Sequence, residues 1–229
     1  KARSEYVGCA FLGGISLDEP TRRGARRLRE EGREEFLPED PFAFVDSQLS
    51  ALAEVGLTPG VNVRSVTPAP VERVARICER HDALCEINAH CRQPAICEVG
   101  AGQSLLADLD RLSSQVAVAT DAGATVSVKV RAGVQSVDLA EVAREIERAG
   151  ATAIHVDAMD SEQALSRVLE ASDLFVIANN GVRDRASVRE YLSLGADAVS
   201  VGRASDQPAV LDRVRRATEE WFHSPEARS

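Results

Sequence analysis

Short apolar runs alternate with amphipathic stretches along most of the chain. Strand-like runs lie at 6–12, 61–63, 83–88, 125–130, 153–156, 174–179 and 198–202. Stretches with helical periodicity follow them, at 19–32, 41–56, 69–80, 104–123, 138–150, 161–171, 184–195 and 207–222. Repeated strand-then-helix units with right-handed crossovers form a parallel sheet that is covered by its helices. The pattern therefore predicts an α/β fold.

The number of strand-like runs separates two α/β architectures. There are seven runs, and a closed (β/α)8 TIM barrel needs eight strands. We predict such a barrel, with residues 1–229 forming one domain and the first strand lying upstream of Lys1. A doubly wound sheet is the alternative. It fits less well, because Gly13-Gly14 after the first run lacks the spacing of a dinucleotide-binding turn.

Composition narrows the possible partners and the compartment. The net charge of −9 disfavours general binding to a nucleic-acid backbone, which needs clustered positive charge. The five cysteines include no Cys-x-x-Cys pair, so we expect neither a disulfide framework nor a metal centre, and we expect a reducing, cytoplasmic location. No apolar run reaches the roughly 18 residues of a membrane span, so we expect no membrane partner.

Polar side chains gather at the predicted strand ends. In a barrel the carboxyl ends of all strands meet on one face, where ligands bind. The residues at these ends are Asn62, Arg64, Asn88, Cys91, Lys129, Arg131, His155, Asp157, Asn179, Asn180, Gly181, Gly202 and Arg203. The densest stretch is 86–102. Taken alone it is equally well explained as a polar loop with incidental cysteines, but the whole set predicts a ligand site.

Lys129 is one of only two lysines in the chain. It alternates with Val126, Val128 and Val130, so it belongs to the opposite face of its strand, together with Ser127 and Arg131. An ammonium group inside a barrel requires an anion or an electron-rich ligand. The alternative is a solvated lysine at the edge of a sheet.

The loops after the last two strands have the composition of a phosphate site. Asn179-Asn180-Gly181 follows one strand, and Gly202-Arg203 follows the next. Glycine permits close approach of the backbone, and loops at these positions of a barrel commonly bind phosphate through N–H groups.

Several motifs, in this order, resemble those of the tRNA-dihydrouridine synthases, flavin-dependent barrels related to the dihydroorotate dehydrogenases. Residues 86–91 read Glu-Ile-Asn-Ala-His-Cys, where the family has Asp-x-Asn-x-Gly-Cys-Pro, and a Gly-x-Gly follows at 100–102. The others are Val-Lys-Val-Arg at 128–131, Ile-Ala-Asn at 177–179 and Gly-Ala-Asp-Ala-Val-Ser-Val-Gly-Arg at 195–203. The resemblance spans about residues 59–205.

The resemblance implies an FMN-dependent oxidoreductase that reduces the C5–C6 double bond of a uracil-type ring. Cys91 would be the general acid, and the neighbouring His90 would lower the pKa of the thiol or take over its role. Lys129 would contact the flavin ring, Asn62 stands where the family has a ring-binding glutamine, and Asn88 would face flavin and substrate. The FMN phosphate would be held by Asn179, Asn180, Gly181, Gly202 and Arg203.

The sequence departs from the family at two of these positions. His90-Cys91-Arg92 replaces Gly-Cys-Pro, and Asp157 stands where the family has its flavin-site histidine. These departures favour a non-catalytic barrel that serves as a binding subunit. A flavin-free barrel that acts on a sugar phosphate through Lys129 or Asp157 is a further hypothesis.

The resemblance also implies the partners. The substrate is uridine in tRNA or a small pyrimidine, with NAD(P)H as an electron donor, and a dihydroorotate-dehydrogenase-like enzyme acting on a free pyrimidine is the nearest alternative. We expect the chain to lack the helical domain that grips tRNA after the barrel in this family. The sequence leaves the oligomeric state open.

Overall fold

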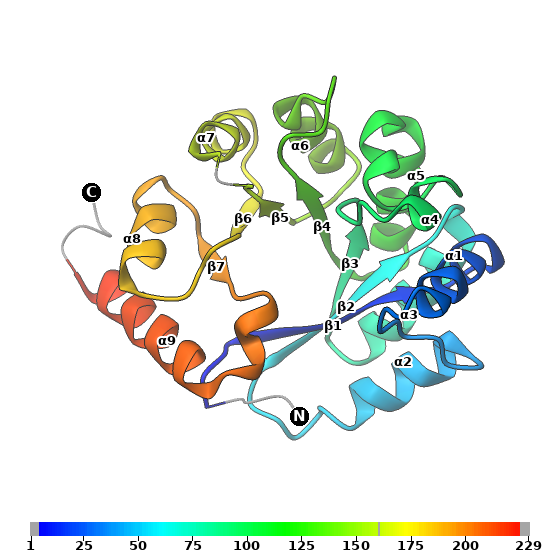
Figure 1. Cartoon of the computed structure of the whole chain (residues 1–229), viewed down its shortest axis with the longest axis horizontal. Coiled ribbons are helices and arrows are strands. Elements are labelled where there is room, and N and C mark those ends of the chain that lie inside the picture. The colour runs from blue at the N-terminus through cyan, green and yellow to red at the C-terminus, as the bar shows by residue number, and fades with distance from the viewer. Residues whose placement is uncertain (1–4, 160, 225–229) are drawn as a thin grey trace.

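The computed structural model describes residues 5–159 and 161–224. Its centre is one curled sheet of seven parallel strands that pair in chain order, with the helices around its outer side (Figure 1). The strands are β1 (Cys9–Ser16), β2 (Thr58–Arg64), β3 (Leu84–Asn88), β4 (Thr125–Arg131), β5 (Ala153–Asp157), β6 (Phe175–Asn179) and β7 (Ala198–Ser200). The predicted α/β fold and the seven strands are confirmed.

Helices follow the strands in the order that the periodicity predicts. They are α1 (Glu19–Glu30), α2 (Pro41–Ser50), α3 (Pro68–Arg80), α4 (Pro94–Cys97), α5 (Leu109–Asp121), α6 (Leu139–Arg148), α7 (Glu162–Ala171), α8 (Arg185–Ser193) and α9 (Pro208–His223). Two 3-10 helices, η1 (Gly102–Ala107) and η2 (Arg203–Asp206), lie in the loops before α5 and α9. Among the described residues β1 and β7 do not pair, so the sheet is a half-barrel that resembles a TIM barrel with one strand missing.

The two faces of the sheet differ in polarity. On β4, Val126, Val128 and Val130 are fully buried in the main hydrophobic core against the helices. Burial of each such side chain contributes about 1.5–3 kcal/mol. Ser127 and Arg131 alternate with these valines and lie on the inner face, as Lys129 does. The predicted placement of Lys129 on the inner face is therefore confirmed.

Several element boundaries differ from the prediction. β1 starts later and continues through Gly13-Gly14, where its register with β2 shifts at a bulge. The predicted helix 104–123 is divided, because the Asp108 carboxylate accepts the N–H of Arg111 and starts a new helix there. The helix predicted over 41–56 ends at Ser50, and the last strand ends at Ser200 instead of residue 202.

An aspartate ties together two loops on the side of the site. One carboxylate oxygen of Asp18 accepts the N–H of Thr21 and caps α1. Its other oxygen accepts the Ser65 hydroxyl at 2.8 Å and the N–H of Val66 at 2.6 Å. The loops that follow β1 and β2 are thus joined by one half-buried group of hydrogen bonds.

The cysteines show how strand position determines burial. Cys78 and Cys85 are fully buried in the main core. Cys9, in contrast, is exposed. The reason is that β1 is an edge strand, and Cys9 is its first residue. Among the helices in the described ranges, none combines the length and the apolar character that crossing a membrane requires.

Candidate functional site

The strand registers place the inner-face polar residues in three successive rows. Moving toward the carboxyl ends, the first row is Asn62, Glu86 and Ser127. The second row is Asn88, Lys129 and His155. The third row is Arg131, Asp157, Asn179 and Ser200. A parallel sheet brings these residues, which are far apart in the sequence, to adjacent positions.

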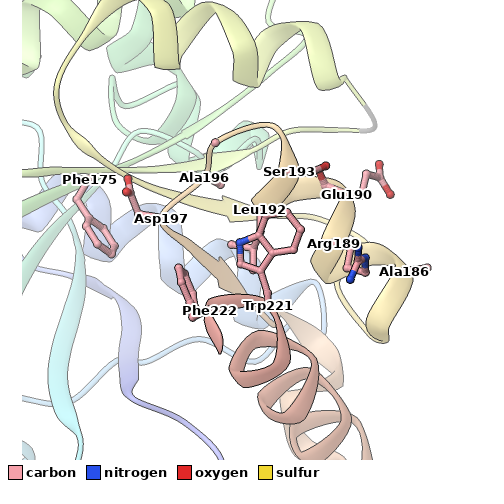
Figure 2. Close-up of a pocket in the computed structure, with 11 residues that line it drawn as sticks. Phe175, Ala186, Arg189, Glu190, Leu192, Ser193, Ala196, Asp197, Trp221 and Phe222 are labelled. Carbon is pink, nitrogen blue, oxygen red and sulfur yellow. The ribbon is translucent and has the colours of Figure 1, made fainter. Parts of the chain in front are cut away.

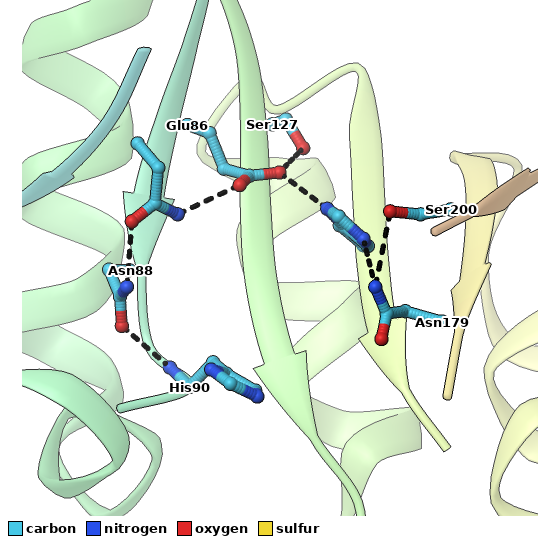
Figure 3. Close-up of polar contacts among 8 residues, drawn as sticks. Glu86, Asn88, His90, Ser127, Asn179 and Ser200 are labelled. Atoms are coloured by element: carbon cyan, nitrogen blue, oxygen red, sulfur yellow. Dashed lines mark hydrogen bonds and ion pairs between the residues drawn. The ribbon is translucent and has the colours of Figure 1, made fainter. Parts of the chain in front are cut away.

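A buried carboxylate lies at the centre of these rows. Glu86 is 1% exposed and accepts hydrogen bonds from the Asn62 amide at 2.8 Å, the Ser127 hydroxyl at 3.2 Å and His155 Nδ1 at 2.8 Å (Figure 3). Burial alone would raise the pKa of Glu86. The imidazole of His155, the ammonium of Lys129 and the Asn62 amide outweigh burial and hold this pKa below its ordinary value.

Two amides connect Glu86 to the loop that carries Cys91. The Asn62 side chain accepts a hydrogen bond from Asn88 Nδ2 at 2.7 Å, and Asn88 Oδ1 accepts the backbone N–H of Cys91 at 2.9 Å and of His90 at 3.2 Å. Asn62 and Asn88 are each 6% exposed. The chain of hydrogen bonds therefore runs from the sheet interior to the backbone of Cys91 and of His90, and Figure 3 shows it as far as His90.

His155 extends the network to the last two strands. Because a carboxylate can only accept, His155 Nδ1 carries the proton and Nε2 accepts from Asn179 Nδ2 at 3.4 Å. The same Asn179 amide donates to the Ser200 hydroxyl at 3.1 Å. Burial lowers the pKa of His155 despite the opposing effect of Glu86.

Lys129 provides positive charge on the inner face. Its ammonium lies near the carboxylates of Glu86 and Asp157, but burial outweighs both and lowers the pKa of Lys129. Within residues 5–159 and 161–224, Lys129 forms no ion pair within 4 Å. Its charge is therefore available to an electron-rich ligand.

His90 and Asp157 form a pair across the strand ends. His90 Nε2 donates to Asp157 Oδ2 at 2.6 Å, and the His90 side chain is 31% exposed. Burial would raise the pKa of Asp157, but the hydrogen bond and the charge of His90 lower it overall. The negative charge of Asp157 is thus paired with His90, and both residues depart from the family motifs.

Cys91 is more buried than its position after a strand end indicates. It is 8% exposed and packs with Leu28 and Ile96 in a small apolar cluster apart from the main core. The Cys97 thiol donates to the Cys91 carbonyl oxygen at 3.4 Å. Burial and the nearby Cys91 raise the pKa of Cys97, which is half-buried. Two thiols therefore lie at the β3 end, although the sequence indicated one.

A glycine fixes the backbone at Cys91. Gly102 has a φ of +63°, and a Cβ there would overlap the carbonyl oxygen of Cys91. The next residue, Gln103, donates its N–H to the same oxygen at 2.9 Å. The Gly-x-Gly stretch is therefore part of the thiol loop itself.

The loops after β6 and β7 expose backbone in place of buried side chains. Gly181 and Gly202 have no atom within 4 Å of the position of an added Cβ, and Arg203 is exposed. Gly181 has a φ of +64° and Asn180 a φ of +118°. Asp184 already caps the start of α8, so an anion here would have to use the loop N–H groups and Arg203.

Several site-side residues were not assigned a role from the sequence. Arg64 forms a buried ion pair with Glu35 at 2.7 Å, and Glu35 lies in a loop that gave no signal. Arg131 is 8% exposed and donates to the Met159 sulfur at 3.2 Å. Glu86 could have been found, because it lies two residues before Asn88 and so shares its strand face.

These residues fit the chemistry of FMN. The inner face offers an ammonium for the electron-rich edge of a flavin ring, amides for its polar atoms, and an open glycine loop with an arginine for its phosphate. For a metal the donor set is poor: the described part of the chain holds no group of three or more His, Cys, Asp or Glu residues with suitable geometry.

A hollow of about 900 Å³ lies at the opposite end of the sheet (Figure 2). Its apolar side chains include Phe175, Trp221 and Phe222, and its charged side chains are those of Arg189, Glu190 and Asp197. Phe175 is the first residue of β6, whereas Asn179 is the last. The hollow is therefore separate from the polar rows.

The fold and the polar strand ends define a TIM-barrel-like α/β protein with its site at the carboxyl ends of the strands. The family model for dihydrouridine synthase (Dus) matches residues 58–227, which is most of the chain. The chain belongs to the dihydrouridine synthase family, as the sequence motifs indicated. Its fold and family are those of flavin-dependent oxidoreductase-like barrels.

Relatives and solved structures add to this assignment. An uncharacterized protein of Methanocaldococcus jannaschii, MJ0144, is 27% identical over 205 residues, covering 84% of this chain and 78% of that protein. A dihydroorotate dehydrogenase (DHODH) from Eimeria tenella has a TM-score of 0.56 at 16% identity, over 77% of this chain and 61% of that one. The 3-hexulose-6-phosphate synthase of Salmonella typhimurium has a TM-score of 0.53 at 17% identity, over 90% of this chain and 96% of that one. Both structural likenesses concern the fold alone.

Proposed function

We propose that this protein is an FMN-dependent oxidoreductase that reduces the C5–C6 double bond of a uracil-type ring. The observation that carries the proposal is the joint presence of the buried amide and carboxylate rows, the Lys129 ammonium and the Cys91 loop at one end of the sheet. Membership of the dihydrouridine synthase family supports the same chemistry.

Each group has a distinct role in this proposal. Lys129 holds the electron-rich edge of the flavin ring, and Asn62 and Asn88 line the ring with amides. The phosphate is bound by Gly181, Gly202 and Arg203, together with Asn179 and Asn180. Asp157 acts through His90, because the pair is joined at 2.6 Å. When bound, reduced FMN supplies a hydride equivalent to one carbon of the substrate double bond.

The protein supplies the proton. Hydride addition leaves carbanion character on the neighbouring carbon, so a positioned acid accelerates the reduction. Cys91 donates this proton from its thiol. The two hydrogen bonds to the Cys91 and His90 N–H groups and the packing of Gly102 hold the loop in place. His90, which is partly exposed, returns a proton to the thiol from solvent.

Cofactor content is the first test. The purified protein is expected to be yellow, with an absorbance band near ~450 nm from the flavin, or to gain this band when FMN is added. NAD(P)H is expected to bleach the band under anaerobic conditions. A colourless protein that does not take up FMN contradicts the proposal and favours a flavin-free barrel.

The role of Cys91 has a matched control in Cys97, the second thiol at the same strand end. Cys91→Ala is expected to lower the rate of substrate reduction about 100-fold or more, without loss of bound FMN. Cys97→Ala is expected to change the rate only slightly. Equal rates in the wild type and Cys91→Ala would remove the thiol from the mechanism.

The substrate class needs a separate comparison. The family name points to uridine in tRNA, whereas the net charge of −9 favours a small pyrimidine over a polyanion. Mass spectrometry of dihydrouridine in tRNA, with and without the gene, tests the first. Reduction of free uracil or orotate by the purified protein tests the second.

A further inference from the structure

The hydrogen bonds that converge on Glu86 all have the same sense. From the Cys91 backbone, donors point through Asn88 Oδ1 and Asn62 Oδ1 toward Glu86 Oε1. From the other side, the Ser127 hydroxyl and His155 Nδ1 donate to Glu86 Oε2, and Asn179 donates to His155 Nε2. Glu86 is therefore the common acceptor at which these hydrogen-bonded chains from β2 to β6 end (Figure 3).

The two ends of the Asn88–Asn62 chain determine how both amides are oriented. A backbone N–H can only donate, so Asn88 must turn its oxygen toward Cys91 and its nitrogen toward Asn62. A carboxylate can only accept, so Asn62 must turn its nitrogen toward Glu86. The requirements from the two ends agree, and neither amide can rotate without facing donor against donor.

We propose that Glu86 is a positioning residue whose buried negative charge sets the direction of this amide chain, and with it the placement of the Cys91 backbone and the proton position on His155. Glu86 touches neither the thiol nor an open part of the site, since it is 1% exposed. It acts through Asn62 and Asn88. The effect of Glu86 on catalysis rests on the proposed function, but its effect on the direction of the hydrogen bonds does not.

Few other charged groups face Glu86. His155 contacts it directly, and the ammonium of Lys129 and the thiol of Cys9 lie close enough to interact with its charge. Cys85 is its neighbour in β3 and is fully buried. The ammonium of Lys129 is thus a nearby positive charge that favours the ionised form of Glu86.

Glu86→Gln tests the proposal because glutamine has one acceptor and one donor end. If its nitrogen faces Asn62, both asparagines must turn over and the Cys91 N–H loses its acceptor. If its nitrogen faces His155, the imidazole must move its proton to Nε2, which then opposes the Asn179 amide. In either case a measurable group changes, whichever way the glutamine lies.

A compensating double variant sharpens the test. Combining Glu86→Gln with Asn62→Asp moves the carboxylate one position along the chain. The new aspartate accepts from Asn88 and from the glutamine nitrogen, and the glutamine oxygen accepts from Ser127 and His155. The hydrogen bonds to the Cys91 N–H, from Asn88, from Ser127 and from His155 regain their original sense. Only the bond between positions 62 and 86 is reversed, and the net charge is the same as in the wild type. Asn62→Asp alone is expected to be disruptive, because it sets two carboxylates against each other.

Two readouts on the cofactor-free protein report the result. Nitrogen-15 NMR of the imidazoles is expected to show His155 as the Nδ1–H form in the wild type and in the double variant. Amide exchange of the Cys91 N–H is expected to rise at least about tenfold in Glu86→Gln if its acceptor is lost, and to return in the double variant. Ser127→Ala is the control, since it removes one donor to Glu86 and leaves the amide chain intact.

The outcomes separate this proposal from the proposed function. Any of three results would overturn the role proposed for Glu86. The first is wild-type His155 in the Nε2–H form, and the second is an unchanged His155 tautomer and Cys91 amide exchange in Glu86→Gln. The third is a double variant whose tautomer and amide exchange are the same as in Glu86→Gln. If Glu86→Gln does not fold, the proposal is tested by the His155 tautomer of the wild type and by whether the double variant folds again. A protein that binds no FMN leaves these tests unaffected. If the FMN-loaded protein reduces its substrate, Glu86→Gln is expected to lower kcat at least about tenfold with little change in KM.

Discussion

The carboxyl ends of β2 to β5 and those of β6 and β7 are built in opposite ways. The first group consists of buried side chains that satisfy one another, with Asn62, Glu86 and His155 all at most 6% exposed. The second group consists of loops with accessible backbone, in which Gly181 and Gly202 have open space where a side chain would be. The protein thus has a rigid half and an open half around one site.

The difference indicates what each half recognises. Buried, oriented amides and charges suit a planar ring of fixed shape, because their hydrogen-bond sense is set before the ligand arrives. Exposed N–H groups and an arginine suit a phosphate, whose charge attracts them without strict geometry. Variants in the first half should therefore change stability, and variants in the second half should change ligand affinity alone.

The largest effect is expected from His155→Leu in the rigid half. It removes a partner of a fully buried carboxylate and should cost about 3–5 kcal/mol of unfolding free energy. Urea denaturation measures the loss. His81→Leu is the matched control, since that histidine pairs with Asp46 near the surface and should cost less than about 1 kcal/mol. Equal losses in the two variants would contradict the distinction between the halves.

Lys129→Met is expected to have the next largest effect, and on cofactor binding. The ammonium supplies the positive charge toward the flavin ring, so FMN affinity should fall about 10- to 100-fold, which corresponds to one charge-assisted hydrogen bond. Titration of FMN followed by absorbance measures it. An unchanged affinity would place the ring elsewhere.

A smaller effect is expected from Arg203→Ala in the open half. Because Arg203 is exposed, its removal should change the unfolding free energy by no more than about 0.5 kcal/mol. FMN affinity should fall about tenfold and depend less on salt, since one charge on the phosphate is no longer paired. Arg213→Ala, an exposed position on α9, is the control and should leave affinity unchanged. A loss of stability in Arg203→Ala would show that the open half is also structural.

The smallest effect concerns Asp157 and pH. The lowered pKa of Asp157 means that its ionised form stabilises the fold above the ordinary aspartate value of about 3.9. This contribution is lost as the pH falls through the lowered pKa. Urea denaturation from pH 7 to pH 3 should therefore show the wild type losing its advantage over Asp157→Asn toward acid. A constant difference over this range would mean that the pair with His90 adds no stability.

The sequence predicted the elements well because alternation and helical periodicity are local. The valines of β4 assigned Lys129 to the inner face, and the strand ends identified most of the polar residues now found in adjacent rows. The boundaries were less accurate where a single side chain decides them. Asp108 starts a new helix inside a continuous periodic stretch, and nothing in the periodicity marks that position.

The contacts of the site could not be predicted because they join distant segments. Glu86 and His155 are 69 residues apart, and only the strand registers bring the carboxylate to the imidazole. The pair of His90 with Asp157 has the same origin, with 67 residues between them. The sequence showed departures from the family motifs at His90, Arg92 and Asp157, and the structure shows that His90 and Asp157 contact each other. The burial of Cys91 beside Leu28 depends on the packing of α1 against α4, which no local pattern contains.

The packing of Gly102 on the peptide of Cys91 limits how this protein can change. A methyl group at position 102 would have to push aside a carbonyl that Gln103 already holds, in a backbone conformation that other residues rarely adopt. Natural or laboratory substitutions can replace Cys91, His90 or Arg92 one at a time without this clash. They cannot alter this glycine without also displacing the Cys91 carbonyl across the loop, so position 102 should tolerate little variety in any library made from this chain.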